Sequence, residues 1–163
     1  MPRQLSTPAR AARRAEWLQL DHQLCFALYS ASLAMTKFYK PLLDPLGLTY
    51  PQYLVMLVLW EGDGLTVSQL GDRLALDSGT LTPLLKRLES SDLVRRLRDT
   101  ADERRVLLHL TSAGRALKAK ALAVPESMAG ASGCTLDELA TLTARLRSLR
   151  GQITESTPSP RAA

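Results

Sequence analysis

The chain has 163 residues, a formal net charge of +5 at pH 7 and two cysteines. This length is enough for one domain with a substantial core. No apolar stretch approaches the roughly 20 residues of a membrane-spanning helix, and residues 1–15 lack the apolar segment of a secretion signal. We therefore expect a cytoplasmic protein without membrane contact, whose cysteines do not form a permanent structural disulfide.

The positive charge does not by itself indicate nucleic-acid binding. Lys and Arg nearly balance Asp and Glu between Gly64 and Thr111, and the excess of arginine lies near the two ends of the chain. Any contact with DNA would therefore depend on where individual cations lie rather than on the global charge.

Residues 1–15 are rich in Pro, Arg, Ala and Ser without apolar periodicity, which predicts a flexible arm. In residues 18–40 apolar side chains recur near one helical face, which predicts a helix that Pro41 and Pro45 end. Its apolar content on several faces favours packing against another chain. Residues 52–60 form a nearly uniform apolar helix that must be buried.

Two short helices are expected next. Residues 65–76 repeat apolar side chains behind Thr66, a suitable N-cap. The second helix should begin near Ser78 or Gly79, because Pro83 is tolerated best near a helix start. One face of this helix carries leucines for a core. The opposite face carries hydroxyls suited to base edges and cations suited to phosphates, at Ser78, Thr80, Thr82, Lys86 and Arg87.

After Leu93 the apolar pattern alternates in residues 94–98 and again in residues 104–110, with a polar loop between, which predicts a β-hairpin. Taken alone, such a hairpin could be an ordinary solvated one. Directly after two helices of this kind, and with arginines at its tip and flanks, it is interpreted as the wing of a winged helix-turn-helix spanning residues 47–111. Arg96 and Arg98 are candidate DNA contacts.

The rest of the chain reads as helical. Residues 111–128 predict a helix capped by Thr111 or Ser112, with a kink or an early end at Pro125. Residues 129–133 suggest a flexible linker, and residues 135–138 a capping box that starts a last helix with a leucine stripe. The fold class is thus mainly α with a small β-hairpin wing. Residues 16–46 and 112–155 are interpreted as a dimerisation region, and residues 156–163 as a flexible tail.

The run TVSQLGDRLALDSGTLTPLLKRLESSDLVRRLRDTADERRVLLHLT resembles the DNA-binding lobe of MarR-type bacterial transcription regulators. The resemblance covers roughly residues 20–153. It implies a wing in which Asp102 and Arg104 pair and Arg104 enters the minor groove. With the terminal helices as a homodimer interface, two recognition helices would lie about one turn apart on double-stranded, pseudopalindromic operator DNA.

Cys25 lies among apolar residues, in the middle of the first expected helix. A cysteine in such a place is usually a small buried hydrophobe. A reactive thiol needs nearby cations, a helix N-terminus or hydrogen bonds to its sulfur, and no cation is close to Cys25 in the sequence. The residues alone leave both interpretations open.

The segment LDHQLCFALYSAS, with Tyr39 and Tyr50 further on, resembles the branch of MarR-type repressors that senses organic hydroperoxides (OhrR-like). The resemblance implies that Cys25 is the peroxide-reactive residue and that Tyr39 and Tyr50 of the partner subunit donate hydrogen bonds to it. In some members a second cysteine near the start of the last helix resolves the oxidised sensor, and Cys134 is placed for this role. The alternative is an incidental exposed cysteine.

These observations suggest a repressor that binds DNA when reduced and is released when organic hydroperoxide oxidises Cys25 to a sulfenic acid, which Cys134 converts to a disulfide. The pocket for the peroxide is expected beside Phe26, Tyr29, Met35 and Phe38. The first alternative is a MarR-type repressor controlled by a noncovalent aromatic or anionic ligand.

A thiol enzyme is a weaker alternative. His22, taken to lie on the same helix as Cys25, and His109, expected on a wing strand, lack a recognisable orienting partner. No catalytic residue, cofactor or metal site is expected, since neither cysteine has a Cys or His at zinc spacing.

Overall fold

The computed structural model describes residues 16–102 and 104–157. The arm predicted at residues 1–15 and the tail from residue 158 onward lie outside these residues. The chain divides into two compact units, Met1–Arg115 and Ala116–Ala163. We describe each unit by itself.

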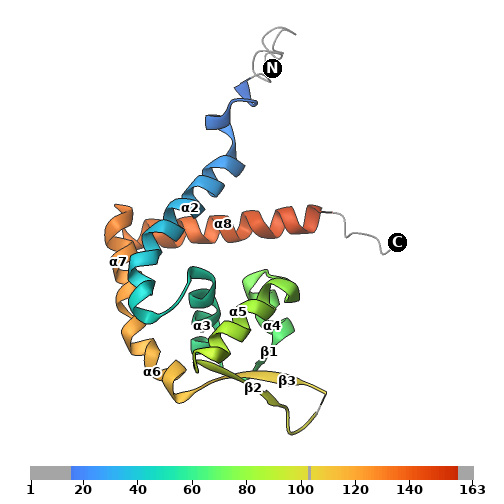
Figure 1. The fold of residues 1–163 in the computed structure, drawn as a ribbon. Helices are drawn as coiled ribbons and strands as arrows, with labels where there is room; N and C mark the ends of the chain where they lie inside the picture. Colours follow the sequence, from blue (N-terminus) through green and yellow to red (C-terminus); the bar gives the residue numbers. More distant parts are fainter. Residues whose placement is uncertain (1–15, 103, 158–163) are drawn as a thin grey trace. The chain divides into compact units, whose positions relative to one another are not determined.

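The first unit is a helical lobe with a small sheet (Figure 1). Within the described residues, β1, β3 and β2 form an antiparallel sheet in that order. This arrangement confirms the predicted fold class. The elements are η1 (Leu20–His22), α2 (Leu24–Leu43), η2 (Asp44–Leu46), α3 (Tyr50–Glu61), β1 (Leu65–Thr66), α4 (Val67–Leu74), α5 (Ser78–Ser90), β2 (Val94–Arg98), β3 (Val106–Leu110) and the start of α6 (Ser112–Ala121).

The core of this lobe forms where α3, α4 and α5 meet the sheet. Val55 and Met56 of α3 are fully buried, as predicted for this apolar helix, and so are Leu70 of α4 and Leu108 of β3. The buried side of α5 is a leucine stripe, consisting of Leu81, Leu85 and Leu88. Burial of these apolar side chains is what holds two short helices in place, since neither is long enough to be stable alone.

The helix starts follow the capping residues in the sequence. Thr66 caps α4, accepting from the Gln69 N–H at 3.2 Å while the Gln69 side chain accepts from the Thr66 N–H at 2.9 Å. Leu65 and Thr66, which precede α4, also form the short strand β1. Helix α5 begins at Ser78 as predicted. Pro83 nevertheless lies in its second turn, so the helix lacks the hydrogen bond that an N–H at residue 83 would make.

Helix α2 differs from the prediction at both ends. It begins at Leu24 rather than Leu18, because residues 20–22 form the separate turn η1. It also continues through Pro41 to Leu43, since one missing N–H does not stop a helix whose last turn is held by the buried Leu43. Cys25 therefore lies in the first turn of α2 rather than in its middle, and His22 belongs to a different element.

The second unit contains the end of α6, α7 (Ala123–Ser132) and α8 (Leu136–Ser156). The break between α6 and α7 falls at Leu122, because the ring of Pro125 conflicts with a helical carbonyl four residues earlier, at Ala121. The predicted flexible linker is wrong, since residues 129–132 continue α7 and only Gly133 takes a left-handed conformation.

Thr135 caps α8 as predicted, with its N–H donating to Glu138 at 2.8 Å. Ser156, expected in the tail, is the last residue of this helix. No single described helix has both the length and the apolar character to cross a membrane, although the bent pair Leu24–Leu46 and Tyr50–Glu61 passes on length and composition alone.

Candidate functional site

The solvent face of α5 carries every residue predicted there for DNA contact. Ser78, Thr80, Thr82, Lys86 and Arg87 are all exposed, while Leu81, Leu85 and Leu88 are buried. Asp77 caps the helix, accepting from the Thr80 N–H at 2.8 Å and from the Thr80 hydroxyl at 2.9 Å. These two hydrogen bonds lower the pKa of Asp77 below its ordinary value, so a negative charge persists at the helix start.

The threonine hydroxyls of α5 already donate within the protein. Thr80 donates to Asp77, and Thr82 donates to the carbonyl oxygen of Ser78 at 2.7 Å. A hydroxyl whose proton is used in this way still offers acceptor lone pairs and, in threonine, a methyl group. In this geometry the face is suited to accept from base amino groups and to contact thymine methyl groups.

The predicted hairpin is present, and it projects away from α3, α4 and α5 (Figure 1). In β2 only Val94 is buried, and Arg95, Arg96, Leu97 and Arg98 are exposed. The Arg96 guanidinium lies 3.3 Å from the Glu89 carboxylate of α5, which fixes the hairpin to that helix. The predicted DNA contacts Arg96 and Arg98 are thus on the wing, and Arg96 is partly neutralised in the free protein.

Backbone hydrogen bonds close the wing tip. The Asp99 N–H donates to the Arg105 carbonyl, and the Arg105 N–H donates to the Asp102 carbonyl, both at 2.9 Å. Asp102 and Arg104 are in contact, as the resemblance implied, but the bond runs from the Arg104 backbone N–H to Asp102 Oδ1 at 3.0 Å. Insertion of the Arg104 side chain into a minor groove remains a prediction.

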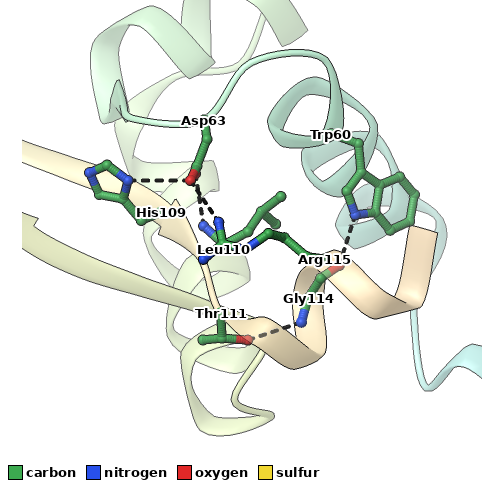
Figure 2. Close-up of polar contacts among 7 residues, drawn as sticks. All are labelled: Trp60, Asp63, His109, Leu110, Thr111, Gly114 and Arg115. Atoms are coloured by element: carbon green, nitrogen blue, oxygen red, sulfur yellow. Dashed lines mark hydrogen bonds and ion pairs between the residues drawn. The ribbon is translucent and has the colours of Figure 1, made fainter. Parts of the chain in front are cut away.

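The base of the wing is fastened by residues that the sequence analysis did not single out (Figure 2). Asp63, in the loop after α3, accepts from the Leu110 N–H at 2.8 Å and lies 3.4 Å from His109 and 3.1 Å from Arg115. Burial opposes ionisation of Asp63, but hydrogen bonds from Leu110 and His109 outweigh it and lower the pKa of this carboxyl. A lone Asp in a turn gives no sequence signal for such a role.

Trp60 and Gly114 make a second contact at the same place. The indole N–H of Trp60 donates to the Gly114 carbonyl at 2.9 Å (Figure 2). Gly114 packs so tightly on Leu93 that a Cβ would lie 2.1 Å from the Leu93 carbonyl oxygen. Both strands of the wing are therefore held where they leave the lobe, β2 next to Leu93 and β3 at Leu110.

The two predicted tyrosines lie together in one chain. The rings of Tyr39 and Tyr50 have centroids 4.9 Å apart, and the nearly buried Tyr53, which the sequence analysis did not identify, lies 6.0 Å from Tyr39. Burial raises the pKa of all three phenols, and neighbouring tyrosines add to the rise at Tyr39 and Tyr53. Their hydroxyls are therefore protonated at neutral pH and available as donors.

Cys25 is exposed in the first turn of α2, rather than buried among apolar side chains. Among the described residues of one chain, its thiol donates to Gln23 Oε1 at 3.9 Å and not to Tyr39 or Tyr50. Backbone N–H groups of a first helical turn lack intrahelical acceptors, so they can donate to a negatively charged atom.

The four side chains expected beside the peroxide pocket lie on α2, where each is at least partly exposed in the single chain. Phe26 and Phe38 are half-buried, while Tyr29 and Met35 are exposed, because a single α2 presents these side chains to solvent. None of the four lines the open pocket of about 290 Å³ that lies further along α2. That pocket is lined by Thr36, Lys37, Lys40, Asp44, Leu48, Thr49, Tyr50 and Pro51.

Cys134 belongs to the second unit and is also exposed. It lies between Gly133, with φ of 66°, and the α8 cap Thr135, as predicted from the sequence. Its thiol donates to the Ser132 carbonyl at 3.6 Å. Among the described residues, no group of three or more His, Cys, Asp or Glu side chains is arranged to hold a metal ion.

Comparison with known proteins relates this architecture to bacterial regulators. Residues 37–121 match the family described as transcriptional regulator SarA/Rot. The chain is 55% identical to the HTH-type transcriptional regulator TtmR of Methylorubrum extorquens over 134 residues, which is 82% of this chain and 69% of the relative. It is 51% identical to the organic hydroperoxide resistance transcriptional regulator of Bacillus subtilis over 132 residues, or 81% of this chain and 90% of the relative.

Among solved structures, the chain is similar to reduced AbfR bound to DNA, with a TM-score of 0.70 and 37% identity over 87% of this chain and 99% of that one. AbfR, a protein of Staphylococcus epidermidis, has also been solved in an overoxidised form bound to DNA and in a disulfide form, with TM-scores of 0.69 and 0.59. The chain is 38% identical to each of these two structures. The match covers 86% of this chain and 98% of the overoxidised form, and 85% of this chain and 98% of the disulfide form.

Proposed function

Because the chain belongs to the MarR/SarA family of transcriptional regulators, we propose that it is a redox-responsive repressor, bound to operator DNA when reduced and released when organic hydroperoxide oxidises Cys25. The observation that carries this proposal is the exposed Cys25 thiol in the first turn of α2. Thiolates react with peroxides, and the start of a helix is one of the places where a thiolate is stabilised. The 51% identity to a regulator named for organic hydroperoxide resistance supports the choice of oxidant.

The working unit is a homodimer. Large apolar side chains of α2 stand in solvent in the single chain, among them Leu24 at 56% and Tyr29 at 61% exposure. The last helix does the same, with Leu142 at 52%. Exposed apolar surface on this scale favours association. A second copy would cover it and bring Tyr39 and Tyr50 of the partner subunit to Cys25 as phenolic donors. The pocket expected beside Phe26, Tyr29, Met35 and Phe38 would then be completed between the two copies.

DNA binding is assigned to α5 and the wing. The exposed hydroxyls of α5 would face base edges, and Lys86 and Arg87 would contact phosphates. Arg98 and Arg104 of the wing would contact the adjacent groove. A two-fold dimer presents two such helices to the two halves of a pseudopalindrome. The proposal places the protein in the cytoplasm, beside the DNA.

The chemistry needs only the peroxide as oxidant. The Cys25 thiolate attacks one oxygen of the O–O bond, which breaks and releases an alcohol after protonation, leaving a sulfenic acid. The Cys134 thiol then attacks the sulfenic sulfur, and a disulfide and water form. The bridge would change the separation of the two recognition helices, so that contacts in both half-sites are lost.

The test is a mobility-shift assay with DNA from upstream of the protein's own gene. Reduced protein should shift the DNA, cumene hydroperoxide should release it, and added reductant should restore the complex. Cys25→Ser should bind equally well and ignore peroxide. Cys134→Ser should still form a sulfenic acid, which dimedone labelling detects, but no disulfide. Peroxide release of the Cys25→Ser variant would exclude the proposal.

The pocket of about 290 Å³ favours one second candidate, a repressor controlled by a noncovalent aromatic or anionic ligand. Tyr50 and Pro51 offer it apolar surface, and Lys37 and Lys40 offer it cations, although Lys40 is ion-paired with Asp44 at 2.9 Å. Under this candidate the mobility-shift complex resists peroxide. Release by salicylate that reductant does not reverse would support it.

A further inference from the structure

Helix α3 connects the tyrosine pair to the base of the wing. At its start, Tyr50 and Tyr53 pack around Tyr39 of α2. At its end, the Trp60 ring lies 6.4 Å from the Tyr53 ring, and the Trp60 indole N–H is bonded to Gly114. The helix between these points is buried at Val55, Met56 and Leu59. Packed interiors transmit displacement because they have few voids in which to absorb it.

The loop that follows α3 is soft by comparison. The chain leaves α3 through Gly62, Asp63 and Gly64, and Gly64 has a φ of 80°. A loop of this composition can absorb a small movement of the helix without passing it on. The Trp60 contact bypasses the loop, because it joins the last turn of α3 directly to Gly114, which packs on Leu93 just before β2. The contacts of Asp63 hold the loop itself to the end of β3 at Leu110.

We propose that Trp60 and Asp63 are positioning residues that form a clamp, through which a change at the Tyr39–Tyr50 pair displaces the wing. The clamp consists of the Trp60–Gly114 hydrogen bond and the contacts of Asp63 with Leu110, His109 and Arg115 (Figure 2). The inference rests on the proposed function and deepens it. Oxidation at Cys25 alters the hydrogen bonding of the tyrosines, α3 moves as a rigid body, and the clamp moves both wing strands together.

If Trp60 and Asp63 couple the two sites, their variants should affect the DNA affinity of the two redox states differently from variants of purely structural contacts. Loss of a purely structural contact would lower the DNA affinity by the same factor in both redox states. A coupling residue instead changes the ratio of the DNA dissociation constant of the oxidised protein to that of the reduced protein. In the full-length protein, Trp60→Phe keeps an aromatic side chain but removes the indole N–H donor. Asp63→Asn keeps an acceptor for Leu110 but loses the charge opposite His109 and Arg115.

The experiment measures this ratio with the upstream DNA fragment before and after cumene hydroperoxide. For both variants we expect the ratio of the oxidised to the reduced dissociation constant to fall about 2- to 30-fold. The rate at which dimedone labels oxidised Cys25 should be unchanged. The matched control is Glu61→Gln. Glu61 lies at the same end of α3 but pairs with Arg73 of α4, so the ratio should equal that of the wild type.

The outcomes distinguish failure of the clamp from failure of the redox-repressor function. A wild type released by peroxide together with variants that keep its ratio would overturn the clamp and leave the redox repressor intact. A wild type whose affinity ignores peroxide would overturn the proposed function and the clamp with it. If thermal unfolding shows that Trp60→Phe is not folded at the assay temperature, Asp63→Asn decides the question.

Discussion

Gly114 lies directly against the carbonyl oxygen of Leu93, at a distance that leaves no room for a side chain: a Cβ at residue 114 would come to 2.1 Å from that oxygen. The same oxygen accepts from the Thr111 N–H at 3.1 Å, so it cannot shift without breaking the bond that joins β2 to the start of α6. The close approach of two backbones at this point requires glycine.

Gly114→Ala should therefore lower the free energy of unfolding by about 3 kcal/mol, near the upper end of overpacking costs. The gain in helix propensity, about 1 kcal/mol, works in the opposite direction and is smaller. Urea unfolding followed by circular dichroism measures the change. Gly151→Ala in α8, where a Cβ would meet nothing within 4 Å, is the control and should be neutral or stabilising. Equal stabilities of the two variants would contradict the packing argument.

Asp77→Ala should loosen the start of α5, because it removes the acceptor for the N–H and the hydroxyl of Thr80. Asp77→Asn keeps one acceptor oxygen and should retain the cap. We expect the alanine variant to show a lower Tm and weaker DNA binding than the asparagine variant, by thermal denaturation and mobility shift. Identical behaviour of the two variants would mean that the Asp77 cap does not position the solvent face of α5.

The contribution of Asp63 to stability should depend on pH. Its pKa is lower in the folded protein than the ordinary value of 3.8, so the charged form stabilises the fold above that value. The contribution is lost as the pH falls through the folded-state pKa. The stability difference between wild type and Asp63→Asn should be constant near neutrality and shrink as the pH falls below 3.8. A difference that grows on acidification would reverse the sign and refute the assignment.

Lys86→Ala should weaken DNA binding to all sequences alike, since a phosphate contact carries no base preference. The slope of log K against log salt should become shallower by about 0.9 per protomer. Fluorescence anisotropy at several salt concentrations measures it. Lys37→Ala, which removes the same charge from α2 outside the proposed DNA-binding face, should leave the slope unchanged. An unchanged slope for Lys86→Ala would remove this residue from the interface.

Short-range sequence patterns predicted most elements of the lobe that contains α3 to β3. Caps such as Thr66 and Asp77, leucine spacing in α5 and the alternation after Leu93 each act over a few residues, so they can be identified without knowing the fold. Local patterns gave wrong predictions at Pro41 and at residues 129–132. There, propensity favoured a helix end or a loop, while the helices continue through both.

The sequence by itself identified the residues that are proposed to carry the chemistry: the α5 hydroxyls, the wing arginines, Tyr39, Tyr50 and the two cysteines. Only the tertiary structure decided how they are placed. It set Cys25 in solvent at a helix start, added Tyr53 to the tyrosine pair, and joined Trp60 to Gly114 across 54 residues of chain. Contacts of that kind depend on long-range packing, which leaves no periodic or compositional trace in the segments that meet.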